Sequence, residues 1–458
     1  MITDEMSDRI LDSYFTQHGQ VRLQMYPYEK FMDEKLQHIV SENSMLQITS
    51  STSDEIHTVT FGNITVHKPS VKESSGKMRF VYPREARIRG LTYTCPVTVE
   101  VDHKVHDKTS REITKQTTYS SVPLLSIPSM VRSKYCNLHR NPGNNNECVI
   151  DQGGYFIING SEKTVQSQEK LRTNYPFVFQ AKKPSKYIYS CEVRSLHEDK
   201  MRSTSTLTMH VSIQGDKTPR VVLIVPFVSC PVHVYAAFRI NGVSDIDDMI
   251  NMVLRGNDDR QMRDVMTHIL TSNNPFMEMT DDEIHQWIGQ HGSKEVNPDR
   301  RRRYVSHIFH NEFLPHLGMT RGCEHTYYMK SVYMGYMLYK LLNVFIGRTV
   351  CDDRDNYKNK RLETVGTLMA ILFRQLYRNF LRTFKLSLYK AIEANKYVNV
   401  VDAINSRRMS SAMRYHFATG NWSVSKSVHT HASQNGVVQI LNRMSHVSTR
   451  SQIMRLNT

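Results

Sequence analysis

The densest group of acidic side chains is the run Asp352–Asp355, in which three carboxylates surround one arginine. Carboxylates clustered in this way can hold Mg²⁺ for phosphoryl transfer. Lys358, Lys360 and Arg361 follow within a few residues and add to the positive charge of Arg354. The pattern therefore favours a local ion-pair network that joins the apolar helix before the run to the helix after it.

Sequence motifs that mark common enzyme sites are absent: GxxxxGK[ST], GxGxxG, HExxH and GxSxG. His429 and His431 could suggest a metal, but no third ligand is evident near them. The seven cysteines contain no closely spaced pair, so buried reduced thiols are expected instead of a structural zinc site. No side chain stands out as a nucleophile or general base, and we expect neither catalysis nor a metal from this chain alone.

The distribution of charge indicates a polyanionic partner. The formal net charge is +15, from 59 Lys and Arg against 44 Asp and Glu. Residues 404–458 contain no acid at all. Lys and Arg that neutralise phosphates release counterions, so a nucleic-acid backbone explains this composition. The basic residues of the segment are Arg407, Arg408, Arg414, Lys426, Arg443, Arg450 and Arg455.

Length and composition exclude several classes of protein. A length of 458 residues predicts about three domains, or two domains of which one is interrupted by the other. An apolar content of 39% is enough to bury a core, which excludes a disordered chain. Residues 1–5 do not open a signal peptide, and the apolar stretch 326–347 is interrupted by Lys330, Lys340 and Asn343. We therefore expect a soluble intracellular protein with a core helix there, and no membrane partner.

Hydrophobic periodicity predicts a mixed α+β chain. Helical spacing is found at 7–18 and 28–42, over most of 232–346, and at 362–395. Alternation and β-branched residues predict strands, with the pair 186–196 and 204–214 expected to lie side by side. The other predicted strands are 55–68, 88–102, 155–159 and a short run at 119–125 that Pro123 and Pro128 should end.

A series of short motifs, in order along the whole chain, resembles the second-largest subunit of multisubunit DNA-dependent RNA polymerases in its eukaryotic and archaeal form. Any one of these matches is short, but their common order makes the resemblance specific. The segments are Asp12–Phe15 with Gly19–Arg22, Tyr82–Tyr93, Ile127–Cys136, Asp151–Lys163, Asn311–His316, Asp352–Asp355, Ala418–Trp422, Gly436–Arg443 and Arg455–Thr458.

The resemblance implies a multidomain α+β fold with three named parts. Residues 1–184 and 365–410 would form the protrusion, and the lobe would be an insertion at 185–364. The fork would begin in residues 411–458, with its first loop at 420–436. This division agrees with a strand-rich start, a mixed middle and a long returning helix.

The resemblance also implies which side chains face nucleic acid. Lys163, Arg414, Gln439 and Arg455 match family positions that face the RNA–DNA hybrid or the transcript backbone. A lysine is usual where Arg414 stands, so the charge is kept while the geometry changes. For Lys163, the alternative is a surface lysine at a strand end. Such backbone contacts would be independent of base sequence.

Three other residues of the fork segment carry two interpretations each. Asn442 and Arg443 belong to the same fork motif, and they could instead make structural hydrogen bonds and ion pairs inside the fork. Trp422 could stack on a base, although a side chain that anchors the loop to its own domain is favoured.

By the resemblance, this chain is a non-catalytic part of a DNA-directed RNA polymerase. It would shape one wall of the DNA cleft, contact the DNA template and steady the RNA–DNA hybrid. The Mg²⁺ ions of the reaction would lie on the largest subunit, and no cofactor is expected here. The implied partners are that largest subunit, a small zinc-ribbon subunit and initiation factors at the lobe and protrusion. The implied location is the nucleus or the cytoplasm, or a viral factory or virion.

The chain departs from the family in length, since it stops within a motif while family members exceed a thousand residues. A split gene, cleavage or an intein would each explain this, and a second polypeptide would then carry the remainder. Both archaeal and viral origins fit. The competing hypothesis is a free-standing nucleic-acid-binding protein that reuses the fold without the polymerase. Retention of the fork motif around Gln439–Arg443 argues against that alternative.

Overall fold

The fold was obtained as a computed structural model, and the chain divides into two compact units. Unit 1 contains residues 1–169 and 362–458, and unit 2 contains residues 170–361. The chain leaves unit 1 within strand β9 and returns within β15, so unit 2 is an insertion in unit 1. The structure describes residues 4–49, 55–73, 75–108, 112–139, 147–148, 150–182, 184–197, 204–213, 219–272, 274–293, 295–318, 324–394, 399–423 and 433–457.

Unit 1 combines long helices with several small sheets around one long sheet. Its helices are α1 (Asp4–His18), α2 (Arg22–Lys30), a π-helical turn (Phe31–Lys35), α3 (Leu36–Glu42), α4 (Pro83–Ile88), α11 (Val365–Glu393), α12 (Val400–Ala403), α13 (Ser406–Thr419) and α14 (His446–Met454). Its strands, with the two that connect to unit 2, are β1 (Met45–Thr49), β2 (Glu55–Val66), β3 (Ser70–Lys72), β4 (Met78–Phe80), β5 (Thr94–Asp107), β6 (Ile113–Pro128), β7 (Phe156–Ile158), β8 (Ser161–Val165), β9 (Ser167–Leu171), β15 (Lys360–Glu363), β16 (Trp422–Ser423), β17 (Ser433–Gln434), β18 (Val438–Ile440) and β19 (Leu456–Asn457).

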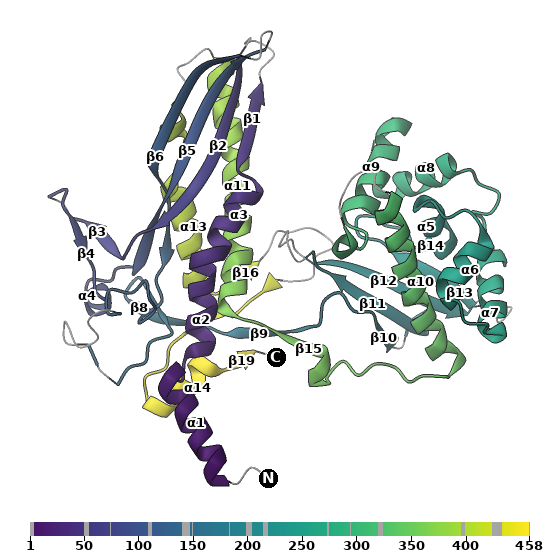
Figure 1. The fold of residues 1–458 in the computed structure, drawn as a ribbon, viewed down its shortest axis with the longest axis horizontal. Helices are drawn as coiled ribbons and strands as arrows, with labels where there is room; N and C mark the ends of the chain where they lie inside the picture. Colours follow the sequence, from purple (N-terminus) through teal and green to yellow (C-terminus); the bar gives the residue numbers. More distant parts are fainter. Residues whose placement is uncertain are drawn as a thin grey trace. The chain divides into compact units, whose positions relative to one another are not determined.

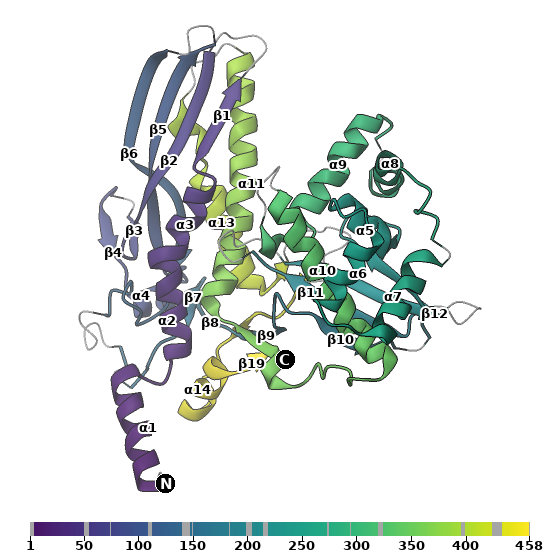
Figure 2. The same cartoon turned by 45° about the vertical axis from the view of Figure 1, so that its right-hand side comes forward.

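The long sheet has the antiparallel order β1-β2-β5-β6, and α11 runs beside β1 along its length (Figures 1 and 2). Aromatic side chains join the sheet to the helix. Phe61 of β2 makes edge-on contacts with Tyr377, Phe380 and Phe384 of α11, with ring centroids 5.7–6.2 Å apart. These residues recur every three or four positions, as one buried face of a helix requires. The helix predicted at 362–395 is therefore confirmed.

Two predictions for the strands of unit 1 are wrong in their bounds. The strand expected at 88–102 begins only at Thr94, because Pro83 starts the short helix α4 and a turn follows it. The run expected to end at Pro123 is the sixteen-residue strand β6, which contains both prolines. Pro123 is tolerated because β6 is an edge strand and its pairing with β5 shifts register there.

The outer edge of β6 is covered by α13. The backbone N–H of Ser126 donates to Ser410 Oγ over 2.9 Å, and Ser410 in turn donates to the Ser406 carbonyl at 2.8 Å. An uncovered edge strand would expose unpaired backbone groups to other chains. Helix α13 therefore protects the sheet and, through this contact, is fixed in position beside it.

Unit 2 has one five-stranded antiparallel sheet with the order β10-β11-β12-β13-β14. The strands predicted at 186–196 and 204–214 pair as β11 and β12, as expected. Its strands are β10 (Phe177–Gln180), β11 (Tyr189–Ser195), β12 (Ser205–Ile213), β13 (Pro219–Ile224) and β14 (Val232–His233). Its helices are α5 (Val234–Ile240), α6 (Ile246–Leu254), α7 (Arg260–Thr271), α8 (Asp281–Gly292), α9 (Pro298–Asn311), α10 (Glu324–Ile346) and two 3₁₀ turns (Pro315–Leu317, Tyr357–Asn359).

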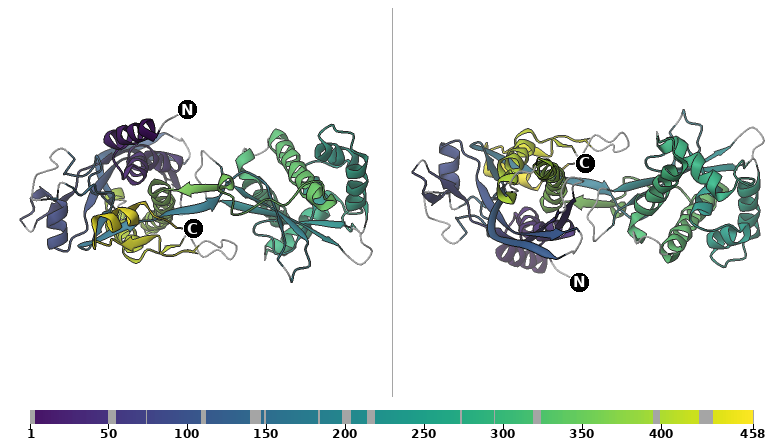
Figure 3. Two further views of the ribbon diagram at one scale, coloured as in Figure 1. Left: turned by 90° about the horizontal axis from the view of Figure 1, so that it is seen from below. Right: turned by 90° about the horizontal axis from the view of Figure 1, so that it is seen from above.

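The helices of unit 2 gather on one side of its sheet, as the two views of Figure 3 show. Burial along β12 alternates with a period of two, which is the pattern of a strand covered on one face. Helix α10 packs on the sheet and contributes Met334, Leu338 and Leu341 to the core. The apolar stretch predicted as a core helix is thus confirmed. Across the described ranges, no helix is long and apolar enough to cross a membrane.

The mixed α+β class predicted from periodicity is confirmed by both units. The N-terminal amphipathic pattern also forms helices, although α1 buries none of its residues within the described chain. Its apolar side chains, among them Ile10 and Tyr14, are about half exposed.

Candidate nucleic-acid interface

Lys163 and Gln439 lie on adjacent strands of the small sheet β18-β8-β7. Ile440 is paired with Lys163 and Gln439 with Thr164. Side chains of consecutive residues alternate between the faces of a strand, so Lys163 and Gln439 point to opposite faces of this sheet. The Lys163 ammonium donates to the carbonyl oxygen of Ala418 at 3.2 Å. Lys163 is therefore turned toward the C-terminal end of α13, where its charge complements the helix dipole.

Arg443 is held by two carboxylates of the same unit. Its Nε lies 2.7 Å from Glu162 Oε2, and its Nη2 lies 3.1 Å from Asp151 Oδ2. Its guanidinium carbon also lies 4.8 Å from the centre of the Tyr155 ring, a cation–π distance. Partial burial alone would lower the pKa of Arg443, but the hydrogen bond to Glu162 and the charges of Asp151 and Glu162 raise it above its ordinary value. Arg443 thus remains a fixed cation in this position.

The carboxylates around Arg443 are fixed by further contacts. Asp151 accepts hydrogen bonds from the Tyr155 hydroxyl at 2.6 Å and from the Gly153 backbone at 3.1 Å. Although burial tends to raise the pKa of Asp151, these two bonds and Arg443 hold it below its ordinary value. Glu162 also binds Arg87 at 3.0 Å. This Arg443 network joins the fork motif to the segment that leads into β7 and β8.

We expect Arg443→Ala to lower the free energy of unfolding of unit 1 by about 1–2 kcal/mol. The loss leaves two carboxylates with fewer partners, but the Arg443 side chain is 39% exposed, so solvent screening limits the effect. Urea unfolding of the full chain measures this change. Arg443→Lys keeps the charge but loses the bidentate geometry. Its free energy of unfolding should lie between that of Arg443→Ala and that of the unsubstituted chain. An unchanged unfolding midpoint for Arg443→Ala would contradict a structural role of the network.

Asn442 organises the turn that precedes α14. Its side-chain oxygen accepts from the Met444 backbone N–H at 2.8 Å, and its own N–H donates to Gln452 Oε1 at 2.6 Å. Its carbonyl accepts from the hydroxyl of Thr449 at 2.8 Å. These bonds explain locally why asparagine suits the position. They are consistent with the structural alternative weighed for this residue, and a contact with nucleic acid stays a prediction.

Arg414 and Arg455 present their guanidinium groups to solvent. Arg414 stands on α13, and Arg455 caps the C-terminal end of α14 through its backbone, which donates to the Gln452 carbonyl. Within the described ranges, neither guanidinium has a hydrogen-bond or ion-pair partner. Both cations are therefore available for a ligand. The six predicted residues are all in unit 1, and two of them, Lys163 and Gln439, lie on opposite faces of their sheet.

Trp422 is an anchor of its own domain. Its side chain is only 1% exposed, and its indole N–H donates to the Leu368 carbonyl of α11 at 2.9 Å. Phe417 of α13 packs edge-on against it at 5.1 Å. The favoured interpretation of Trp422 is confirmed, because a buried indole cannot stack on a base. Most of the predicted first fork loop, residues 424–432 with His429 and His431, lies outside the described residues.

The acidic run 352–355 forms the expected ion pair with the preceding helix, but among the described residues its other ion pair joins Arg354 to Glu192 of β11 and none reaches the following helix α11. Asp352 Oδ2 lies 3.2 Å from Lys340 of α10 and accepts from the Val178 backbone at 2.9 Å. Asp353 instead accepts from the Asp355 backbone, which forms a turn. Across the part of the chain that the structure describes, no three His, Cys, Asp or Glu residues lie together as a metal site would require.

Arg407, predicted only as one basic residue of the acid-free segment, lines a cavity of unit 1 together with Arg414. A signal was present in the sequence, because positions seven apart fall on one face of a helix. The surroundings of this pair come from strands far away in the chain, so the cavity itself could not be inferred.

The family model described as RNA polymerase beta subunit matches residues 19–411. The chain belongs to this family. It is 34% identical to DNA-directed RNA polymerase II subunit 2 of Arabidopsis thaliana, over all of this chain and 40% of that protein.

Two further relatives come from an archaeon and a virus. The identity to DNA-directed RNA polymerase subunit Rpo2N of Methanocaldococcus jannaschii is 28%, over 98% of this chain and 85% of that subunit. The identity to DNA-directed RNA polymerase subunit 2 of Acanthamoeba polyphaga mimivirus is 27%, over 98% of this chain and 39% of that protein. The chain therefore spans about two fifths of the plant and viral relatives, but most of the archaeal one.

Proposed function

We propose that this chain acts as the non-catalytic N-terminal part of the second-largest subunit of a DNA-directed RNA polymerase, a nucleotidyltransferase complex. The observation that carries the proposal is the similarity along the whole chain to polymerase subunits from a plant and an archaeon. The archaeal Rpo2N supports it further, because this chain covers 85% of that subunit's length.

We also propose that unit 2 is the lobe, and that unit 1 contains the protrusion and the start of the fork. The continuous stretch 170–361, inserted between two segments of unit 1, supports this assignment. The boundaries taken from the resemblance, 185–364 for the lobe and 411–458 for the fork, remain part of the proposal.

In this role the chain forms one wall of the DNA cleft and contacts the RNA–DNA hybrid. The segment without acids from residue 404 onward would lie along the nucleic-acid backbone. Lys163, Arg414, Gln439 and Arg455 are the proposed contacts, and the free guanidinium groups of Arg414 and Arg455 support two of them. Phosphate contacts position a protein on nucleic acid but do not read its sequence.

The proposed partners are those of a polymerase. They are the largest subunit, which would carry the Mg²⁺, a polypeptide bearing the remainder of the second-largest subunit, a small zinc-ribbon subunit, initiation factors and the DNA template. The complex would work inside the cell, in the nucleus or cytoplasm, or in a viral factory or virion.

Affinity purification of the chain from its native source, followed by mass spectrometry and a transcription assay, tests this function. We expect the largest subunit and a polypeptide with the rest of the second-largest subunit to be recovered, together with transcription activity. Recovery without any polymerase subunit would overturn the proposal and leave the free-standing nucleic-acid-binding protein.

Arg455→Ala is expected to make the assembled elongation complex dissociate at lower salt without changing promoter choice. Loss of one phosphate contact reduces the slope of log affinity against log salt by about one unit. A salt series on stalled complexes measures this change. Arg300→Ala, at an exposed arginine of α9 in unit 2, is the matched control because it removes the same charge elsewhere. Equal stability of the Arg455→Ala and unsubstituted complexes at every salt concentration would exclude the contact.

A further inference from the structure

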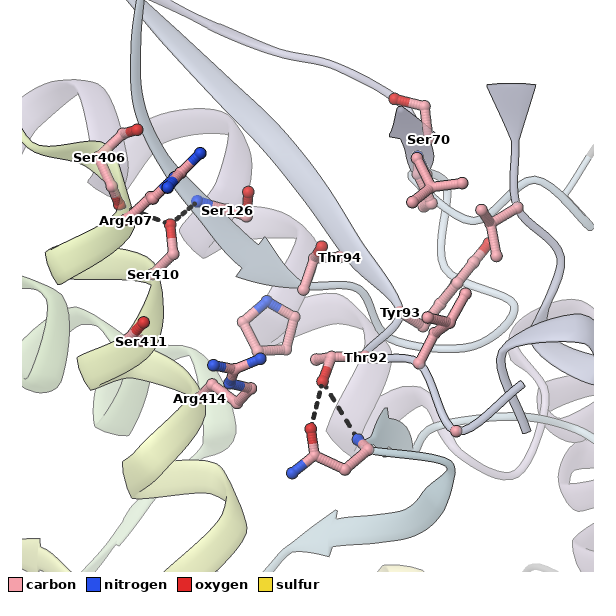
Figure 4. Close-up of a pocket in the computed structure, with 17 residues that line it drawn as sticks. Ser70, Thr92, Tyr93, Thr94, Ser126, Ser406, Arg407, Ser410, Ser411 and Arg414 are labelled. Carbon is pink, nitrogen blue, oxygen red and sulfur yellow. Dashed lines mark hydrogen bonds between the residues drawn. The ribbon is translucent and has the colours of Figure 1, made fainter. Parts of the chain in front are cut away.

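Unit 1 contains a cavity of about 530 Å³ between α13 and the strands beside it (Figure 4). The first half of α13 forms one wall, and the turn before β5 forms the opposite wall. The end of β6, the tip of the β7–β8 hairpin and the start of β3 close the remaining sides. This volume lies within the range of about 300–1,000 Å³ that is usual for small-molecule sites.

Positive charge is concentrated in this cavity and is not neutralised there. Arg407 and Arg414 are the only charged residues among those that line it, and no carboxylate faces them from the described chain. Neither guanidinium has a hydrogen-bond, ion-pair or aromatic partner within the described ranges. By contrast, Arg443 and Arg87 of the same unit are each held by two carboxylates. The cavity therefore has a positive charge that an anionic ligand would neutralise.

Helical geometry places the two arginines at a useful separation. They are seven residues apart, which is two turns and roughly 10 Å along the axis of α13. Ser410 and Ser411 lie between them on the same face, as Figure 4 shows. The hydroxyl of Ser410 is already oriented by its bonds to Ser126 and Ser406. Because Ser410 already donates its proton to the Ser406 carbonyl, the donors that remain on this face are the two guanidinium forks and the Ser411 hydroxyl, and these suit phosphate oxygens.

The opposite wall is both apolar and rigid. Leu91 and Pro128 line it, so a flat apolar group could lie against it. Thr92 Oγ1 donates to Asn159 Oδ1 at 3.0 Å and accepts from the Asn159 backbone at 3.1 Å. Gly160 follows with a φ of +78°, and a Cβ there would approach Gly90 to 2.9 Å. The hairpin tip is therefore packed tightly, and the cavity keeps its shape without a ligand.

We propose that this cavity binds a nucleotide, with its phosphate groups on Arg407 and Arg414 and its base or sugar against the apolar wall. A free nucleotide and a nucleotide within a single strand supply the same chemistry. The inference shares Arg414 and the acid-free segment with the proposed function, and it adds a defined site in which Arg407 is the distinguishing residue. It also stands if the chain assembles into no polymerase.

The test measures binding to the purified full chain by titration of fluorescently labelled ATP and of a labelled single-stranded oligonucleotide. Arg407→Ala is expected to weaken binding of at least one probe about tenfold, since charge-assisted hydrogen bonds are lost. Inorganic tripolyphosphate should compete with that probe. Arg382→Ala is the matched control, because Arg382 is an exposed arginine of α11 that lies outside the cavity and outside the acid-free segment. It removes the same charge and should change affinity less than twofold.

The two probes distinguish the sources of the nucleotide. Arg407-dependent binding of ATP supports a free nucleotide. Arg407-dependent binding of the oligonucleotide alone, with a salt slope reduced by about 0.7, supports a strand. Equal losses in Arg407→Ala and Arg382→Ala would overturn the proposal in favour of diffuse attraction. No binding of either probe by the unsubstituted chain would overturn it as well. Both arginines are exposed, so thermal unfolding is expected to be the same for all variants.

Discussion

Gly366→Ala is expected to destabilise unit 1 by about 3 kcal/mol or more. Gly366 lies in the first turn of α11, where that helix crosses α2. A Cβ at this position would come within 1.9 Å of the Pro27 carbonyl oxygen and 2.6 Å of its carbon. Since both are backbone atoms, no side-chain rotation can relieve the overlap, and the two helices would have to separate.

The sign of this effect follows from two opposing terms. In a helix without such a neighbour, Gly→Ala stabilises by roughly 0.5–1 kcal/mol, because alanine has less backbone freedom to lose. Overpacking of a close-packed interface costs about 1–3 kcal/mol, and more where backbone must move. The overlap with Pro27 is more severe than the 2.9 Å approach that a Cβ at Gly335 would make to the Met252 carbonyl in unit 2. We therefore expect the steric cost to dominate at Gly366 and to be smaller at Gly335.

The two tryptophans of the chain allow each unit to be followed separately, since Trp422 lies in unit 1 and Trp287 in unit 2. In a Trp287→Phe background, the fluorescence of buried Trp422 reports urea unfolding of unit 1. Ser387→Ala, at an exposed position of the same helix, is the control and should shift stability by less than about 0.5 kcal/mol. A Gly366→Ala chain that unfolds at or above the midpoint of the unsubstituted chain would contradict the close contact with Pro27.

Lys330→Ala is expected to destabilise unit 2 by about 3–5 kcal/mol. Lys330 of α10 is fully buried, and its ammonium donates to the carbonyls of Phe309 at 2.9 Å and His310 at 2.7 Å. These carbonyls belong to the last turn of α9, where the helix itself supplies fewer N–H donors. The substitution would remove both hydrogen bonds from Lys330 and create a cavity. Lys330→Met keeps much of the volume and should cost less.

The same residue predicts a pH dependence with a definite sign. Burial lowers the pKa of Lys330 to about 8, while in the unfolded chain it is about 10.4. Below pH 8 both states carry the proton, so the cost of burying the charge is constant. Between these two pKa values the unfolded state binds more protons, so unit 2 gains stability as the pH rises, by about 3 kcal/mol at most.

Trp287 fluorescence in a Trp422→Phe background, measured by urea unfolding between pH 7 and 10.5, tests both statements about Lys330. Tyrosines and cysteines also titrate in this range, so the relevant quantity is the difference between the unsubstituted chain and Lys330→Met. That difference should increase with pH. A difference that stays constant from pH 7 to 10.5 would mean that Lys330 has an ordinary pKa in the fold.

Hydrophobic periodicity was sufficient to predict the helices and strands that have one buried face. Helix α11 and the pair β11 and β12 follow directly from their apolar spacing. It was insufficient where tertiary contacts outweigh local preference. Pro123 remains within β6 because that strand lies at an edge, and a sequence does not reveal which strand has no neighbour.

The same holds for single side chains: packing within a short segment could be predicted, whereas contacts between segments far apart in the sequence could not. Trp422 was expected to anchor its loop, because a lone tryptophan in a short segment usually packs on its domain. The pairing of Arg443 with Glu162 was open, since 281 residues separate the two in sequence. Lys330 could be read only as an interruption of an apolar helix, because the carbonyls that it binds belong to another helix.

The interrupted course of unit 1 has a consequence for synthesis on the ribosome. The side-chain amide of Gln24 donates to the Ile453 carbonyl at 2.8 Å, so the first long helices close onto the last one. Unit 2 is continuous and has emerged while the segment 362–458 is still being made. At about 5–20 residues per second, synthesis of the 192 residues of unit 2 delays the second segment of unit 1 by roughly 10–40 s. During this interval the N-terminal helices and the long sheet lack α11, and we expect them to need protection by chaperones until α11 has emerged.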